Sequence, residues 1–198
     1  MKKQIKPRYI FLFAVALLLI DQISKIIIKT TMTIGEEIEI FSWFRIYFIE
    51  NNGAAYGMSL GGEYGKLILS LLRVGLITGF IVYLVKLYKK HISTGFILAS
   101  TMIIAGALGN LIDSAVYGLI FEESTFTHVA GYTKDGYAPL LYGKVVDMLY
   151  FPLFTIDNPF WSNEPYTFFS PIFNIADSYI TIAIFYMFLF ERKTLKLL

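Results

Sequence analysis

Cysteine is absent from this chain of 198 residues, and histidine occurs only twice. Without cysteine the chain has no disulfide, no thiol nucleophile and no cysteine-ligated zinc, and cysteine usage cannot indicate its compartment. His91 and His128 alone cannot supply a Ser-His-Asp triad or a histidine-rich metal site. Carboxylates therefore remain as the groups able to perform acid–base chemistry.

Charged residues are scarce as well. They make up 16% of the chain, against about 25% in a typical soluble domain, while 56% of the residues are hydrophobic. This composition excludes a disordered protein and argues against a soluble globular domain, because so small a body could not hide that much apolar surface. The net charge of +2 is too small to indicate nucleic-acid binding. Aromatic residues reach 17%, which suits a protein anchored at two membrane interfaces.

Four apolar runs occupy residues 9–28, 67–88, 95–113 and 172–190. Each has about the length needed to cross a ~30 Å hydrocarbon core as a helix, and a helix is needed because lipid offers the backbone no hydrogen-bond partner. The first run, which follows several basic residues, could instead be a secretory signal peptide. No small-x-small cleavage site follows it, so we expect a retained span.

Basic residues flank these runs on one side. Most of them lie before the first run, between the second and third, or after the fourth: Lys2, Lys3, Lys6, Arg8, Lys86, Lys89, Lys90, Arg192, Lys193 and Lys196. The other two connections, at about 37–60 and 114–171, hold most of the acidic residues. The positive-inside rule then predicts that both termini are cytoplasmic and that the long connections lie outside. The expected fold class is an all-α integral membrane protein, with four transmembrane helices in a single membrane domain over 1–198.

The outer connections are not plain linkers. Residues 37–49 read EIEIFSWFRIYFI, a partly alternating run rich in β-branched and aromatic residues. We expect one or two β-strands of a small sheet there, near the membrane surface. The connection at 114–171 is long, poorly periodic and rich in glycine, proline and tyrosine.

Polar residues cluster near the outer ends of three spans, although an ionisable group inside a span costs about 2.5–3.5 kcal/mol. They form three pairs at helical spacing: Asp21 with Lys25, Asn110 with Asp113, and Asn174 with Asp177. Residues three or four apart share a helix face. Helix capping and snorkelling to the interface would explain many such residues singly, and Lys29, Lys66 and Lys144 are expected to need nothing more. The convergence of the pairs at one depth favours a shared polar site.

Paired carboxylates suggest a chemistry for this site. Two carboxyl groups brought close cannot both ionise, so one accepts a proton from water while the other donates to a carbonyl oxygen. That is hydrolysis without a covalent intermediate. A proton or ion relay in a small transporter is one alternative, although the polar residues stop near the outer third of the bilayer, apart from Arg73. A structural subunit docking through its outer loops is the other.

Five motifs in chain order resemble those of the prolipoprotein signal peptidases, also called signal peptidase II. They are DQISK at 21–25, NGAAY at 52–56, GNLID at 109–113, VVDM at 145–148 and FNIADS at 173–178. Each motif is weak alone, but five in the right order relative to four spans are strong. The resemblance covers all four spans and the first outer connection, and the second connection only in patches.

The resemblance implies a four-span aspartic endopeptidase of the bacterial cytoplasmic (inner) membrane, with its active site facing the outer side. It implies removal of the signal peptide of a prolipoprotein, just before a cysteine that carries diacylglycerol. Asp147 and Asp177 would be the catalytic pair, with no metal or other cofactor. The implied partners are this substrate, membrane lipids and the inhibitor globomycin, but no nucleic acid, and the expected state is a monomer.

The same matching implies supporting or substrate-binding roles for ten further residues: Asp21, Lys25, Asn52, Gly53, Asn110, Asp113, Ser114, Val146, Asn174 and Ala176. Small residues such as Gly106 and Gly109 would let backbones approach closely. The sequence departs from the family at two positions, where Ala105 replaces a glycine and Ser114 replaces an arginine. Serine cannot make the arginine's usual contact to the substrate or the β-sheet, because it has neither the charge nor the fork of donors. Residues 119–142 and 152–167 look like insertions, forming either a lid or a lipid-contacting surface.

Overall fold

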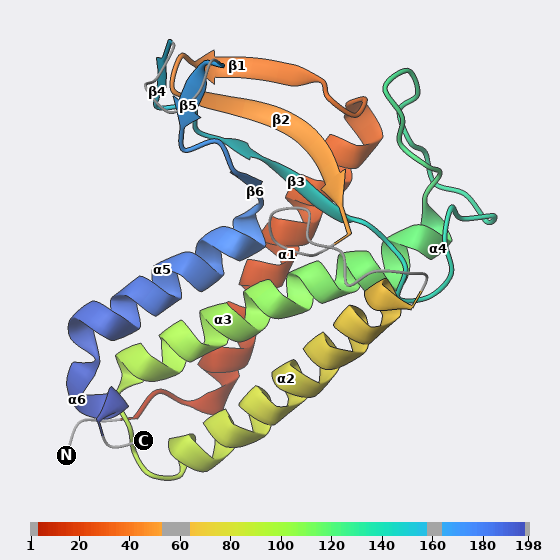
Figure 1. The fold of residues 1–198 in the computed structure, drawn as a ribbon. Helices are drawn as coiled ribbons and strands as arrows, with labels where there is room; N and C mark the ends of the chain where they lie inside the picture. Colours follow the sequence, from red (N-terminus) through yellow and green to blue (C-terminus); the bar gives the residue numbers. More distant parts are fainter. Residues whose placement is uncertain (1–3, 53–63, 158–163, 197–198) are drawn as a thin grey trace.

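The computed structural model describes residues 4–52, 64–157 and 164–196. Four long helices run side by side, and an antiparallel sheet covers one end of the bundle (Figure 1). The helices are α1 (Pro7–Thr31), α2 (Gly65–Tyr88), α3 (Thr94–Ile112) and α5 (Ile175–Phe190), and the short α6 (Arg192–Leu195) follows the last of them.

The helices expose many large apolar side chains, and α1 in addition buries charged ones, the reverse of the pattern in a soluble protein. On α1 the buried residues are Leu17, Asp21, Lys25 and Lys29, whereas Phe11 is 68% exposed. α1, α2 and the continuous helical segment Thr94–Ile120 are long and apolar enough to cross a membrane. The helices therefore have the surface of membrane-embedded segments.

The fourth apolar run begins its helix later than the sequence predicts. Ile172–Phe173 form strand β6, and Asn174 caps α5. The Asn174 side chain accepts a hydrogen bond from the Asp177 amide, and the Asp177 side chain accepts one from the Asn174 amide, which is the reciprocal pattern of a capping box. This cap fixes the first helical residue at Ile175, so α5 has 16 residues.

The third apolar run continues further than the predicted end at residue 113. A π-helical turn, η2 (Asp113–Tyr117), and α4 (Gly118–Ile120) extend α3. The loop that leads to β3 packs on this extension, since the Gly143 amide donates to the Ser114 carbonyl at 2.8 Å. A Cβ at Gly143 would lie 2.2 Å from the Asp113 carbonyl oxygen, so only glycine permits this approach.

Two antiparallel sheets lie beyond the bundle. The larger has the order β1-β2-β3-β6, with β1 (Glu37–Phe41), β2 (Phe44–Asn51) and β3 (Val145–Tyr150), and the smaller pairs β4 (Phe154–Ile156) with β5 (Tyr166–Phe168). The prediction of strands within 37–49 is thus confirmed. β6 pairs with the end of β3 and leads directly into α5. The sheet therefore brings β3 to the start of α5.

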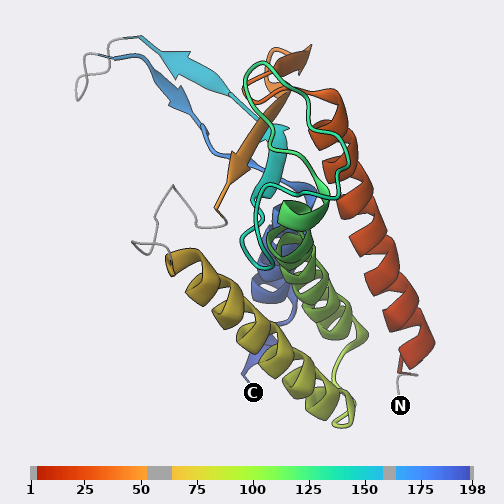
Figure 2. The same cartoon turned by 90° about the vertical axis from the view of Figure 1, so that its right-hand side faces the viewer.

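The opposite end of the bundle gathers the beginning and end of the described chain (Figures 1 and 2). Gln4 donates to the Tyr88 carbonyl at 2.6 Å, and the Tyr88 hydroxyl donates to the Ile5 carbonyl at 2.8 Å. Leu195 packs against a buried cluster that includes Leu87 and Phe96. Both described ends and the α2–α3 connection therefore lie on the side away from the sheet.

Candidate active site

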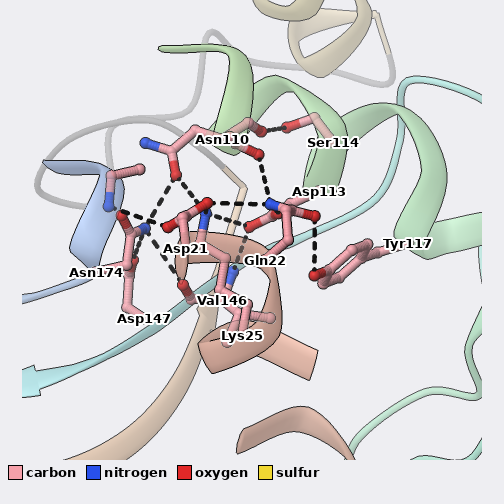
Figure 3. Close-up of polar contacts among 12 residues, drawn as sticks. Asp21, Gln22, Lys25, Asn110, Asp113, Ser114, Tyr117, Val146, Asp147 and Asn174 are labelled. Atoms are coloured by element: carbon pink, nitrogen blue, oxygen red, sulfur yellow. Dashed lines mark hydrogen bonds and ion pairs between the residues drawn. The ribbon is translucent and has the colours of Figure 1, made fainter. Parts of the chain in front are cut away.

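Asp147 and Asp177 meet where β3 reaches the first turn of α5. Asp147 is only 3% exposed, and Asn174 Nδ2 donates to its Oδ1 at 2.7 Å (Figure 3). The same Asn174 accepts from the Asp177 amide at 3.0 Å and donates its own amide to Asp177 Oδ2 at 3.3 Å. One asparagine therefore holds both carboxylates in a fixed relation.

Two more amide side chains complete this arrangement. Asn110 Nδ2 donates to Asp177 Oδ1 at 2.8 Å, while its Oδ1 lies 3.0 Å from Asn174 Nδ2. From the end of β2, Asn51 Nδ2 donates to Asp147 Oδ2. Each aspartate thus accepts hydrogen bonds from uncharged donors, which orient the carboxylates without neutralising them.

Burial raises the pKa of Asp147 from its usual 3.8 to about 7, and the negative charge of Asp177 is the second cause. Hydrogen bonds from Asn174 and Asn51 and the charge of Lys25 act in the opposite direction. The Asp147 carboxyl can therefore gain or lose a proton near neutral pH. A site with one protonated and one ionised carboxyl can supply a general acid and a general base together.

Lys25 links α1 to β3 and α5 through two buried aspartates close to Asp147 and Asp177. Its side chain is completely buried, and its Nζ lies 3.1 Å from Asp21 Oδ2 and 2.9 Å from Asp113 Oδ2. The predicted contact of Asp21 with Lys25 is therefore present. Asp113 accepts from the Val146 amide of β3 at 3.3 Å, and Asp21 accepts from the Ala176 amide of α5 at 3.0 Å. Lys25 also donates to Asn110 at 2.8 Å, so this buried cation is linked directly to the amide network.

Gln22 belongs to the same cluster, although it is not among the site residues predicted from the sequence. Its Nε2 lies 3.0 Å from both Asp21 Oδ2 and Asp113 Oδ1, and its Oε1 accepts from the Tyr117 hydroxyl at 3.2 Å (Figure 3). Gln22 stands inside the DQISK motif, and its polarity within a span was a usable signal. The role of Tyr117 had no such signal, because the residue lies in a connection predicted to be loop.

The predicted close approach of backbones is confirmed at Gly106 of α3, whereas Gly109 permits the close approach of a side chain. A Cβ on Gly106 would lie 2.4 Å from the Ala176 carbonyl oxygen of α5. A Cβ on Gly109 would lie 2.4 Å from Asp21 Oδ2 on α1. These glycines let α1, α3 and α5 pack closely enough for their polar residues to meet.

Asn52 does not contact either aspartate of the pair among the described residues, and its predicted contact with the substrate or the covering loop stays a prediction. Asn52 is exposed and accepts from Lys66 Nζ at 3.1 Å, while its neighbour Asn51 contacts Asp147. Successive side chains of a strand point to opposite faces, so a shift of one residue exchanges the two asparagines. Gly53, the next predicted site residue, lies outside the described residues.

Ser114 is buried and bonds to its own helix, donating from Oγ to the Asn110 carbonyl at 3.2 Å. It lies near the cluster but supplies no charge there (Figure 3). Within the described residues, no group of three or more His, Asp or Glu side chains is arranged to hold a metal ion.

The chain is similar to known proteins over most of its length. A family model described as signal peptidase (SPase) II matches residues 13–192. A lipoprotein signal peptidase of Porphyromonas gingivalis is 42% identical over 191 residues, covering 93% of this chain and 83% of the relative. One from Amoebophilus asiaticus is 32% identical over 195 residues, covering 93% of this chain and 78% of the relative.

Two solved structures, each described as a bacterial membrane enzyme, have a similar fold. Both are 28% identical to this chain with a TM-score of 0.65. One comparison covers 96% of this chain and 90% of the other, and the second covers 98% of both. Similarity in sequence and in fold over nearly the whole chain leads to one conclusion: this chain belongs to the signal peptidase II family of membrane proteases.

Proposed function

We propose that this protein is an aspartic endopeptidase that cuts diacylglyceryl-modified prolipoproteins just before the lipidated cysteine, with Asp147 and Asp177 as the catalytic pair. The observation that supports this most strongly is that the buried Asn174 bonds to both carboxylates, with the pKa of Asp147 raised to about 7. Such a pair retains one shared proton at neutral pH. Its protons belong to the pair rather than to either residue.

The reaction needs only this pair and a water molecule. The ionised carboxylate takes a proton from water as the water oxygen attacks the scissile carbonyl carbon. The protonated carboxyl donates its proton to the carbonyl oxygen. The resulting gem-diol collapses, the C–N bond breaks, and the leaving nitrogen receives a proton from the pair. The products are a signal peptide with a new carboxyl terminus and a chain that begins with the lipidated cysteine.

The remaining residues orient this pair. Asn174, Asn110 and Asn51 hold the carboxylates by hydrogen bonds. Asp21 and Asp113 fix β3 and α5 against α1 through Lys25, so their main contribution is to stability. Ser114 acts through its helix rather than on substrate.

The protein crosses the bacterial cytoplasmic membrane four times as one membrane domain, with both termini in the cytoplasm and the sheets on the outer side. Basic residues such as Lys86, Lys89 and Arg192 support this orientation. At 1.5 Å per residue, the 16 residues of α5 span about 24 Å of a ~30 Å core. Its capped start therefore lies below the outer surface, where a lipid-modified substrate arrives laterally.

The protein acts as a monomer surrounded by lipid, and globomycin inhibits it by occupying the site as an uncleaved mimic.

Cleavage by the purified protein tests the proposal. The substrates are a diacylglyceryl-modified prolipoprotein and its unmodified precursor, and the variants are Asp147→Asn and Asp177→Asn, with Asp135→Asn as an exposed control. We expect the wild type and the control to cut only the modified substrate, and both site variants to be inactive while remaining folded. Near-normal cleavage by either site variant refutes the assignment of the pair, and inactivity of the folded wild type refutes the function.

A further inference from the structure

Lys29 is buried one helical turn beyond Lys25 on the same face of α1. Its side chain is 0% exposed, and its Nζ lies 2.5 Å from Glu50 Oε1 and 2.8 Å from Ser124 Oγ. The expectation that Lys29 merely reaches the water interface is therefore wrong. The charge is held inside the protein by a specific set of partners.

Lys29 and these two partners come from three separate parts of the chain. Lys29 belongs to α1 and Glu50 to β2, while Ser124 belongs to the segment 119–142 that the sequence marks as an insertion. Two aromatic rings of that segment also face the cation, with Nζ 5.5 Å from the Phe121 ring centroid and 5.1 Å from that of Tyr137. The inserted segment thus encloses the ion pair.

Stability alone does not account for this arrangement. Burying an ion pair removes both charges from water, and apolar replacements of similar size are often equally stable. The Glu50 carboxylate is also incompletely satisfied, because its buried Oε2 has no hydrogen-bond partner among the described residues.

Glu50 directly precedes Asn51, the last residue of β2. Glu50 lies opposite Val146 in the sheet, one residue before Asp147, and Asn51 donates to the Asp147 carboxylate. The end of a strand has few ladder hydrogen bonds to hold it. A 2.5 Å contact from Lys29 to Glu50 fixes this end from outside the sheet.

We infer that Lys29 and Glu50 are positioning residues for the catalytic pair, because their buried ion pair holds the end of β2 so that Asn51 stays bonded to Asp147. This inference rests on the proposed function. The inserted segment covers Lys29 and contacts it through Ser124, Phe121 and Tyr137.

The hydrogen bond from Asn51 favours the ionised form of Asp147, so its loss raises the pKa of that carboxyl further. The other charged groups near Asp147 are Asp177 on α5 and Lys25 on α1. Those near Lys29 are Glu50 on β2, with Lys144 and Glu123 in the loop before β3. Replacing the Lys29–Glu50 pair with apolar residues removes one positive and one negative charge together and leaves Asp177, Lys25, Lys144 and Glu123 unchanged.

The test is the variant Lys29→Met with Glu50→Leu, assayed on the diacylglyceryl-modified prolipoprotein. We expect the melting temperature to stay close to that of the wild type. We expect kcat to fall by about 10- to 100-fold with little change in KM. The alkaline limb of the pH–rate profile should move to higher pH. Asn51→Ala should displace the limb in the same direction, and the combination of all three changes should add little to either.

The matched control is Lys144→Met with Glu123→Leu. This Lys–Glu pair, 2.9 Å apart, lies in the neighbouring loop, but its side chains are 29% and 60% exposed. The backbone amide of Lys144, which a side-chain substitution does not change, keeps its hydrogen bond to the Tyr137 hydroxyl. We expect unchanged kcat and an unmoved limb for this control.

An active wild type together with unchanged kcat and pH profile in the buried-pair variant overturns the positioning role alone. Absence of wild-type cleavage overturns the proposed function and the positioning role with it. If the double variant does not fold, Lys29→Met with Glu50→Gln takes its place, because glutamine keeps the shape of Glu50 and no uncompensated charge is left. The same displacement of the limb is expected, and an unmoved limb overturns the inference.

Discussion

Replacing Asp147 with asparagine should abolish activity and yet stabilise the protein at alkaline pH. The carboxyl is 3% exposed and its pKa is raised from 3.8 to about 7. A raised carboxyl pKa costs nothing at low pH, where folded and unfolded states are both protonated. The cost then grows as the pH rises from about 4 to 7 and stays constant above that.

The magnitude follows from this displacement. At about 1.4 kcal/mol per pKa unit, a rise of about three units corresponds to roughly 4 kcal/mol of lost stability above neutral pH. Asparagine avoids this loss but has a single acceptor oxygen, whereas Asn174 and Asn51 each donate to one oxygen of Asp147. One of these two donors is then left without an acceptor, which costs about 1–3 kcal/mol of unfolding free energy. The net gain at about pH 8 is therefore roughly 1–3 kcal/mol.

The unfolding free energies of the wild type and of Asp147→Asn, measured in detergent at about pH 4.5 and pH 8, check this reasoning. The hydrogen-bond loss is the same at both pH values, so the difference between the proteins should grow by about 3 kcal/mol in favour of the variant. Asp135→Asn, at an exposed loop position, should show no such growth. A difference that does not depend on pH would refute the assignment of a buried, proton-retaining carboxyl at position 147.

Three further outcomes follow from the site. Lys25→Met leaves two buried carboxylates, Asp21 and Asp113, without their cation. It should lower the unfolding free energy by about 3–5 kcal/mol, measured by thermal unfolding in detergent. An unchanged melting temperature would contradict the buried triad of these three residues. Gly106→Ala places a Cβ 2.4 Å from the Ala176 carbonyl oxygen and should cost about 1–3 kcal/mol, whereas Gly75→Ala, with nothing within 4 Å, should cost nothing. Cleavage rates should fall above about pH 7 as the pair loses its shared proton, and a rate that stays constant to about pH 9 would argue against acid catalysis by this pair.

Local signals were sufficient for much of the site. The spacings of Asp21 with Lys25 and of Asn174 with Asp177 fix which side chains share a helix face or a cap, because these contacts lie within one turn. The motifs also indicated Asp147 as part of the same cluster. Apolar length and composition similarly predicted the long helices.

Other features depended on contacts between distant parts of the chain. The choice of Asn51 over Asn52 was set by the register of β2 against β3, since a shift of one residue turns a side chain to the other face. The extension of α3 past residue 113 relies on loop amides such as that of Gly143, which bond to its carbonyls.

The sequence alone determined that the chain has membrane-length apolar helices, strands at 37–49 and a set of polar residues too costly to leave unpaired in lipid. Helix length, strand alternation and the cost of a buried charge are local properties, so they can be predicted from the sequence without the fold. Only the tertiary structure decided which partners meet those charges. Lys29 is the clearest case: its sequence context matches that of any interfacial lysine, and it is buried because Glu50 and Ser124, far along the chain, converge on it and replace the water that its charge would otherwise need.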